Sequence, residues 1–178
     1  MERKNILVIN GSASAASANQ QLIHQLVAAT KNQFNIKHSP DLKLLPHFSP
    51  ELSIADTPEA VLSFRREVAT ADGVIICTPE YIFSIPSGLK NALEWCVATP
   101  VFNGKPLGII TASANGQKGH IELQLIMQTL MATFTPGTTL LIPGIKGKVD
   151  AQGAITDIAT TEALEQFLNE FSALVAGA

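Results

Sequence analysis

Gly73-Val74-Ile75-Ile76-Cys77 is the stretch that decides the fold, because it is the clearest buried strand in the sequence. Its apolar run is continuous, whereas a strand with one face in water would alternate apolar and polar residues. Residues 5–10, which carry Ile6-Leu7-Val8-Ile9, show the same pattern. Both segments are therefore predicted to be strands of a parallel sheet that is covered on both faces.

Other runs of strand length alternate with segments of helical period along the chain. Further strands are predicted at residues 34–37, 107–111 and 138–142. Helices are predicted where Leu22, Ile23, Leu26 and Val27 recur at helical spacing, and over residues 60–69, 87–97, 121–132 and 161–175. This alternation predicts an α/β fold, a doubly wound five-stranded parallel sheet with helices on both faces. No repeat or low-complexity linker divides the sequence, so we expect one domain over residues 1–178.

The composition limits the classes of partner. The 178 residues carry a net charge of −3, which argues against nucleic acid or an anionic membrane, because both attract basic surfaces. Apolar runs stop well short of the roughly 20 residues of a membrane-spanning helix. Ile6-Leu7-Val8-Ile9 is too short for a signal-peptide core. We therefore expect a cytoplasmic protein without a membrane partner, and two buried free thiols at Cys77 and Cys96.

The loops after the first, third and fourth strands are expected to carry the chemistry, because ligands of such sheets bind at the carboxyl ends of the strands. The loop of residues 10–19 holds only small or uncharged polar side chains. Gly11 permits a tight turn, and Ser12, Ser14 and Ser17 offer hydroxyl donors. Ser17 or Asn19 suits the start of a helix, whose positive end attracts phosphate. A flexible Ser/Ala loop with an ordinary helix cap is the alternative.

Other phosphate-binding and catalytic motifs are missing from the sequence. No Gly-Lys-Ser/Thr marks an NTPase P-loop, and no Gly-x-Gly-x-x-Gly marks a dinucleotide fingerprint. Residues 10–19 lack the Cys and the Arg of a cysteine-nucleophile phosphatase. No Ser-His-Asp order, metal-spaced His/Cys cluster or Gly-x-Ser-x-Gly elbow is present. A flavin enzyme needs none of these, because its cofactor carries the redox chemistry, so no catalytic side chain and no metal site is predicted.

The loop after the strand at 73–77 has features that suit a flat heteroaromatic ring. Pro79 and Pro86 stiffen this loop and leave backbone amides exposed between them. Apolar side chains such as Tyr81 are available for the faces of the ring. The alternative is a loop of core-packing aromatic residues with Glu80 at the surface.

Several motifs resemble those of the NADPH-dependent FMN reductase family, which includes quinone, azo-dye and chromate reductases of flavodoxin-like fold. The most specific motif is Pro79-Glu80-Tyr81, followed by Ser84-Ile85-Pro86 and Leu89-Lys90-Asn91-Ala92-Leu93-Glu94-Trp95. The match runs nearly end to end. The other matching motifs, in chain order, are Gly11-Ser12 with Ser17 and Asn19, Asp41-Leu42 with Leu45-Pro46 and Phe48, Gly104-Lys105-Pro106, and Asp150-Gln152-Gly153.

The resemblance implies FMN as the cofactor and NAD(P)H as the electron donor. It places the loop of residues 111–120 against the edge of the flavin ring, with Ala112 and Ser113 nearest. His120 is expected to face solvent at a helix start, and His24, His38 and His47 are read as structural or surface residues. The predicted cofactor-binding residues are Gly11, Ser12, Ser14, Ser17, Ala18, Asn19, Pro79, Glu80, Tyr81, Ile82, Ser84, Ala112, Ser113 and Gly116.

Two positions depart from the family pattern. The family commonly has Arg at the position of Ser14 and Asn at the position of Ile82. One charged contact to the phosphate and one side-chain contact are therefore absent, which predicts weaker or differently tuned FMN binding.

The activity implied by the resemblance is ping-pong electron transfer from NAD(P)H through FMN to quinones or similar small acceptors. Family members are usually dimers or tetramers, so a homodimer or homotetramer is expected, with Phe48 and the helix after Pro86 at the interface. Two alternatives stay open. One is a non-catalytic FMN-binding electron carrier, and the other is a degenerate binding module, which the residues at Ser14 and Ile82 would favour.

Overall fold

The computed structural model describes residues 3–14, 16–150 and 152–178, so Ala15 of the predicted phosphate loop lies outside the described residues. The strands form a five-stranded sheet in the order β2-β1-β3-β4-β5, and all neighbouring strands are parallel. They are β1 (Lys4–Asn10), β2 (Phe34–His38), β3 (Gly73–Thr78), β4 (Leu107–Ser113) and β5 (Thr139–Pro143). The predicted doubly wound α/β fold is confirmed.

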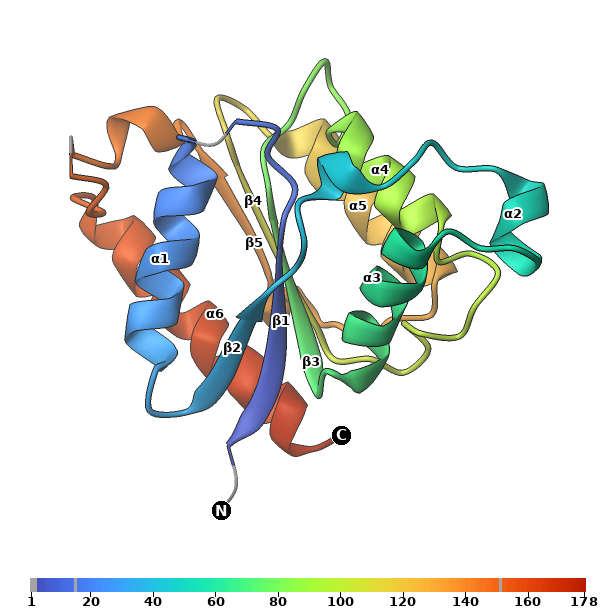
Figure 1. The fold of residues 1–178 in the computed structure, drawn as a ribbon. Coiled ribbons are helices and arrows are strands. Elements are labelled where there is room, and N and C mark those ends of the chain that lie inside the picture. The colour runs from blue at the N-terminus through green and yellow to red at the C-terminus, as the bar shows by residue number, and fades with distance from the viewer. Residues whose placement is uncertain (1–2, 15, 151) are drawn as a thin grey trace.

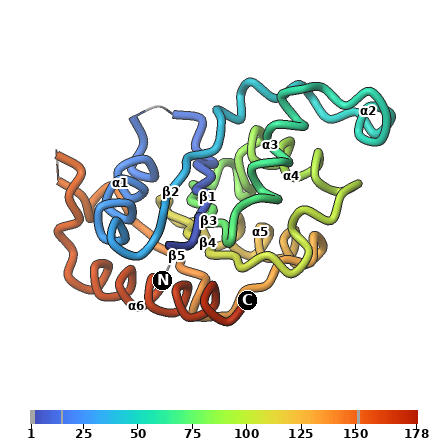
Figure 2. The backbone as a smooth tube through the Cα atoms, turned by 60° about the horizontal axis from the view of Figure 1, so that its bottom comes forward, coloured from blue at the N-terminus to red at the C-terminus, as the bar shows by residue number. Residues whose placement is uncertain are grey.

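Helices cover both faces of the sheet, as Figures 1 and 2 show from two directions. One face carries α1 (Ala18–Thr30) and α6 (Ile158–Ala176), and the other carries α3 (Glu59–Thr70), α4 (Ser87–Glu94) and α5 (Gln117–Thr129). The remaining elements are the short helix α2 (Pro50–Ile54) and the 3-10 turns η1 (Leu42–Leu44), η2 (Pro136–Thr138) and η3 (Ile145–Gly147). No helix in the described ranges is long and apolar enough to cross a membrane.

The central strand β3 contributes side chains to two hydrophobic cores. Ile75 and Cys77 pack in the core beneath α1 and α6, whereas Val74 and Ile76 pack in the core beneath α3, α4 and α5. Every residue of β3 is buried. Burial on both faces explains why the sequence of this strand is continuously apolar.

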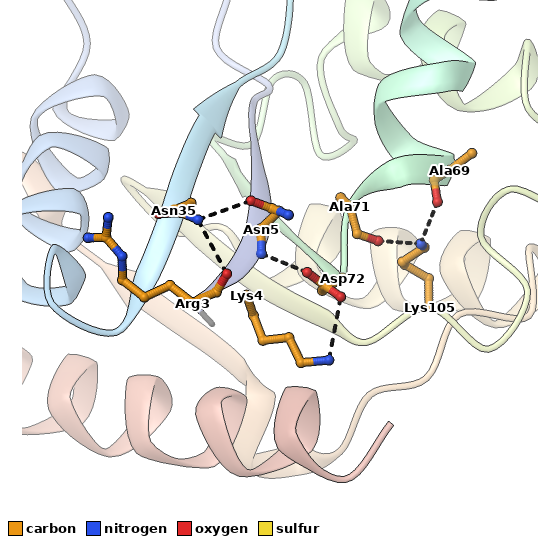
Figure 3. Close-up of polar contacts among 8 residues, drawn as sticks. All are labelled: Arg3, Lys4, Asn5, Asn35, Ala69, Ala71, Asp72 and Lys105. Carbon is orange, nitrogen blue, oxygen red and sulfur yellow. Dashed lines mark hydrogen bonds and ion pairs between the residues drawn. The ribbon is translucent and has the colours of Figure 1, made fainter. Parts of the chain in front are cut away.

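Polar side chains join the elements at the amino edge of the sheet, opposite the expected site (Figure 3). The Asp72 carboxylate accepts a hydrogen bond from the Asn5 N–H at 2.7 Å. The Lys105 ammonium donates to the carbonyl oxygens of Ala69 and Ala71, where α3 ends. Burial lowers the pKa of Lys105, and the nearby Asp72 partly offsets that change. Lys105, part of one motif of the resemblance, therefore has a structural role at this edge.

Several helix bounds differ from the predicted ones, and a capping contact from outside the periodic segment explains the earlier starts of α6 and α5. α6 begins at Ile158 and not at 161, because Asp157 caps it by accepting a hydrogen bond from the Thr160 N–H at 2.9 Å. α4 ends at Glu94 and not at 97. α5 starts four residues before its predicted position, because its capping group comes from a different loop.

Candidate functional site

A cavity of about 1000 Å³ opens at the carboxyl ends of the strands, beside the start of α1. Strands β1 and β3 are neighbours in the sheet although β2 separates them in the sequence, so the switch in strand order lies between them. Ligands of doubly wound sheets bind at such a switch point. The loops after β1, β3, β4 and β5 border the cavity.

Most of the predicted cofactor-binding residues meet in this cavity. Those that line it are Ser12, Ser14, Ser17, Ala18, Asn19, Pro79, Tyr81, Ala112 and Ser113. Gly11 lines a neighbouring hollow of about 360 Å³, which shares Ser12 and Tyr81 with the cavity. The residues that line neither space are Glu80, Ile82, Ser84 and Gly116.

One wall of the cavity, the loop after β5, holds none of the predicted cofactor-binding residues. This loop contributes Gly144, Ile145, Lys146, Gly147, Val149 and Asp150. The rule that ligands bind at the carboxyl ends of strands could have found it, because β5 ends at the same edge as β1, β3 and β4.

The start of α1 supplies hydrogen-bond donors to the cavity. Ser17 caps the helix, because its hydroxyl oxygen accepts a hydrogen bond from the Gln20 N–H at 3.1 Å. The N–H groups of Ala18 and Asn19 precede the first hydrogen bond inside the helix and have no backbone acceptor among the residues that the structure describes. Ser12 lines the same cavity. Free N–H groups at the positive end of a helix suit an anion such as phosphate.

The side chain of Asn19 is turned into the protein and is only 3% exposed. Its amide group donates to the Ala112 carbonyl oxygen at 3.0 Å, and its amide oxygen accepts from the Cys77 thiol at 3.3 Å. Burial raises the pKa of Cys77 to about 12, so the thiol remains a donor. Asn19 therefore joins α1 to the ends of β3 and β4, and its side chain is already fully engaged.

Glu80 connects the loop after β3 to the start of α5. Its carboxylate accepts hydrogen bonds from the N–H groups of Gly119 at 2.8 Å and Gly116 at 3.4 Å. The Ser113 hydroxyl donates to the Glu80 carbonyl oxygen at 3.3 Å. A carboxylate at a helix N-terminus is favoured by the helix dipole. Glu80 is thus the cap of α5, and this contact holds two of the site loops together.

Tyr81 and Ser84 close a tight turn by exchanging two backbone hydrogen bonds of 2.9 and 3.0 Å. Their N–H groups are therefore already engaged within the turn, contrary to the expectation of free amides in this loop. The central residues Ile82 and Phe83 have φ values of 50° and 57°. Such a type I′ turn favours Gly, Asn or Asp. The Asn that the family commonly has at the position of Ile82 would suit this backbone.

Replacing Ile82 with asparagine is expected to raise the free energy of unfolding by about 1 kcal/mol, because a β-branched residue is strained at positive φ. The side chain is 94% exposed, so little packing is lost. Thermal unfolding measures the gain. Ile158→Asn is the matched control, since Ile158 is 76% exposed but lies in helix α6, and it should give no gain. A melting temperature of Ile82→Asn at or below wild type would contradict the expectation.

The prediction that His120 faces solvent is wrong. His120 lies in the first turn of α5 and is half-buried, with its Nδ1 atom 2.8 Å from the hydroxyl oxygen of Thr111. Thr111 is fully buried in β4. Burial lowers the pKa of His120 below its ordinary value of 6.5, because the imidazolium ion loses hydration. His120 does not line the cavity, so its role is structural.

The lowered pKa of His120 predicts that stability falls in mild acid. The unfolded chain binds this proton near pH 6.5, whereas the folded protein binds it only at lower pH. The neutral ring therefore contributes stability that is present above pH 6.5 and is lost as the pH falls through the folded pKa. Urea unfolding of wild type and His120→Gln between pH 7.5 and 5 should show a smaller loss for the variant. An NMR titration of His120 with its midpoint at or above 6.5 would refute this.

The cavity fits FMN in size and in chemistry. Its volume lies at the upper end of the range for ligand pockets, which is roughly 300–1,000 Å³. The start of α1 offers N–H and hydroxyl donors for a phosphate. Pro79, Tyr81 and Ala112 offer apolar surface for a flat ring in the same cavity.

The family model of the NADPH-dependent FMN reductases matches residues 4–146. A 2-hydroxy-1,4-benzoquinone reductase from a Burkholderia species is 32% identical over 176 residues, which cover 96% of this chain and 95% of the relative. A quinone reductase from Escherichia coli K12 is 28% identical and covers 98% of this chain, with 96% of its own length matched. The solved structure of FerB, a flavoenzyme NAD(P)H:(acceptor) oxidoreductase from Paracoccus denitrificans, shares the fold, with a TM-score of 0.79 and 24% identity over 98% of both chains. The chain therefore belongs to the NADPH-dependent FMN reductase family, as its motifs predict, and is a flavin-dependent oxidoreductase.

Proposed function

We propose that this chain passes electrons from NAD(P)H to quinones or similar small acceptors through FMN held in the cavity beside α1. The observation that carries the proposal is one cavity of about 1000 Å³ that joins the donor-rich start of α1 to the ends of β3 and β4. FMN has two matching parts, an anionic phosphate and a flat ring. The names of the two relatives, both of them quinone reductases, support quinones as acceptors.

The residues of the chain hold and orient the cofactor in this proposal. The free N–H groups at the start of α1 and the hydroxyls of Ser12, Ser14 and Ser17 bind the phosphate. Pro79 and Tyr81 border the ring. The hydroxyl oxygens of Ser12 and Tyr81 lie 3.4 Å apart, so the phosphate loop and the ring loop orient each other. Bound FMN supplies the hydride chemistry.

The hollow of about 360 Å³ next to the cavity is our candidate for the place where donor and acceptor bind in turn. It shares Ser12 and Tyr81 with the cavity and extends to His47 and the start of α4. Its size is at the small end for ligand pockets, so it has room for one ring system at a time. This supports ping-pong turnover, in which oxidised NAD(P) leaves before the acceptor enters.

We further propose that α4 and α5 pack against a second copy of the chain. Large apolar side chains are exposed on this side of the molecule, among them Ile121 at 58%, Leu125 at 62% and Val97 at 65%. Ile121 and Leu125 are one helical turn apart on α5, so they form a continuous patch. Phe48 is half-buried and packs edge-on against Trp95 at 5.3 Å between ring centroids, so it contributes less exposed surface.

Sedimentation equilibrium tests the proposed oligomer. Wild type should sediment as a dimer or tetramer, and Leu125→Glu should shift it towards the monomer, because a charge in an apolar interface loses hydration. Ser172→Glu, on the opposite helix layer, is the control and should leave the mass unchanged. A monomeric wild type would reject this part of the proposal.

Two measurements test the proposed activity. A fluorescence titration of the protein with FMN should show saturable binding. Steady-state oxidation of NAD(P)H with benzoquinone should give parallel lines in double-reciprocal plots. Binding without turnover would favour the electron carrier, and protein that cannot be loaded with FMN would favour the binding module.

A further inference from the structure

We propose that Lys146, on the loop after β5, supplies the positive charge that pairs with the phosphate of the flavin. The inference rests on the proposed function, because it requires the phosphate to lie at the start of α1. It assigns a binding role to a residue that lies outside the motifs quoted for the resemblance.

The predicted phosphate loop has no cation of its own. Residues 10–19 contain neither Lys nor Arg, so this loop itself offers a phosphate only neutral hydroxyl and N–H donors. A phosphate monoester carries a charge of about −1.5 to −2 at pH 7. Hydrogen bonds between ionised partners are roughly twice as strong as neutral ones. A cation from another segment would therefore add markedly to the affinity for FMN over a flavin without phosphate.

The loop after β5 runs along the cavity from the loop after β4 to the flank of α1. At its beginning, the Gly144 N–H donates to the Ala114 carbonyl oxygen at 3.1 Å. Further on, the Ile155 N–H donates to the Gln25 side chain at 3.4 Å, and the same side chain donates to the Gly153 carbonyl oxygen. Figure 1 shows this loop in orange beside the beginning of α1. The loop is thus held at one end by the loop after β4 and at the other by the middle of α1.

Lys146 is the cation that this loop offers to the cavity. Its neighbour Lys148 is engaged, because its ammonium group contacts Asp157 at 3.5 Å and Thr160 at 3.1 Å. Lys146 takes part in no ion pair within the ranges that the structure describes. It lines the cavity together with Ser14 and Ser17 of the phosphate loop.

The other charged residue along this wall is Asp150, whose carboxylate is turned to its own loop. One carboxylate oxygen accepts hydrogen bonds from the N–H groups of Gln152 at 2.9 Å and Ala154 at 2.8 Å. These contacts hold the negative charge to the backbone of the loop. The base of the turn is anchored as well, because Ile145 is only 3% exposed. Lys146 therefore sits on a fixed turn at the cavity wall, and its side chain has no competing partner of opposite charge among the described ion pairs.

The test compares FMN with riboflavin, which has the same ring and no phosphate. Lys146→Gln should weaken FMN binding about five- to tenfold, as expected for a charge-assisted contact near solvent, and should leave riboflavin binding unchanged. The dependence of FMN affinity on salt concentration should also flatten. Lys146→Arg should retain the wild-type affinity, and Ser14→Arg added to Lys146→Gln should restore part of it.

Lys118→Gln is the matched control, because Lys118 is exposed on α5 and does not line the cavity. It should change neither affinity. Lys146→Gln with unchanged FMN affinity, or with equal losses for FMN and riboflavin, would overturn the role of Lys146 while leaving the proposed function intact. Wild-type protein that binds no FMN would overturn the proposed function and this inference with it.

Discussion

Replacing Gly11 with alanine is expected to lower the free energy of unfolding by about 2–3 kcal/mol and to weaken FMN binding on the order of tenfold. A Cβ atom at this position would lie 2.4 Å from Thr78 Oγ1 and 2.9 Å from Leu89 Cδ2. Thr78 is fully buried and its hydroxyl donates to the Pro79 carbonyl oxygen at 3.0 Å, so it is held in place. The end of β1 must therefore move away from β3, and the Gly11 N–H would lose its 2.9 Å hydrogen bond to the Cys77 carbonyl oxygen.

Urea unfolding and FMN titration of the same preparation measure the two effects of Gly11→Ala. Gly88→Ala is the stability control, because the nearest atom to its added methyl group is Leu42 Cβ at an ordinary 3.9 Å. Gly88 lies within α4, so alanine there should raise stability by about 0.5–1 kcal/mol. If Gly11→Ala were as stable as wild type and bound FMN equally well, the close approach of β1 to Thr78 would not constrain the site.

Replacing Arg65 with methionine should lower the free energy of unfolding by about 3 kcal/mol. Arg65 is only 8% exposed, and the groups that accept hydrogen bonds from its guanidinium are neutral. The Nε atom donates to the Trp95 carbonyl oxygen at 2.8 Å, and Nη2 donates to the Ser53 hydroxyl at 2.8 Å. Methionine has a similar length but no donors, so both acceptors would stay buried without a partner. The contacts also join α2 and the end of α4 to α3, which explains why a large loss is expected.

Arg66→Met is the matched control for Arg65→Met. Arg66 is the next residue on α3, but it is exposed and its ion pair with Glu59 is 3.5 Å long at the surface. Exposed pairs of this kind contribute about 0–1 kcal/mol. Chemical denaturation of the two variants should therefore separate them by about 2 kcal/mol or more. If the two variants lost equal stability, the loss would come from removing a positive charge and not from breaking the buried contacts of Arg65.

The strands were predictable because each depends on a short-range pattern. A strand that is buried on both faces must be apolar at every position, and Val74-Ile75-Ile76 meets that condition without reference to its neighbours. The short helix α2 was not predicted, since five residues are too few to show a helical period.

The motifs identified the loops that form the site. They did not indicate which contacts each side chain makes there. Most of the predicted residues line one cavity, because parallel strands bring the loops at their carboxyl ends together. The partners inside those loops come from distant parts of the chain. Glu80 caps a helix that begins 37 residues later, at Gln117, and the side chain of Asn19 bonds to Ala112.

The sequence by itself therefore determined the α/β fold, the family and the edge of the sheet where the cofactor is proposed to bind, because periodicity and contiguous motifs carry that information. Only the tertiary structure decided that Asn19 faces inward, that His120 is bonded to Thr111, and that Lys146 lines the cavity. These features depend on which loops become neighbours and on what each side chain meets after packing. The spacing of residues along the chain shows neither which loops become neighbours nor what each side chain contacts.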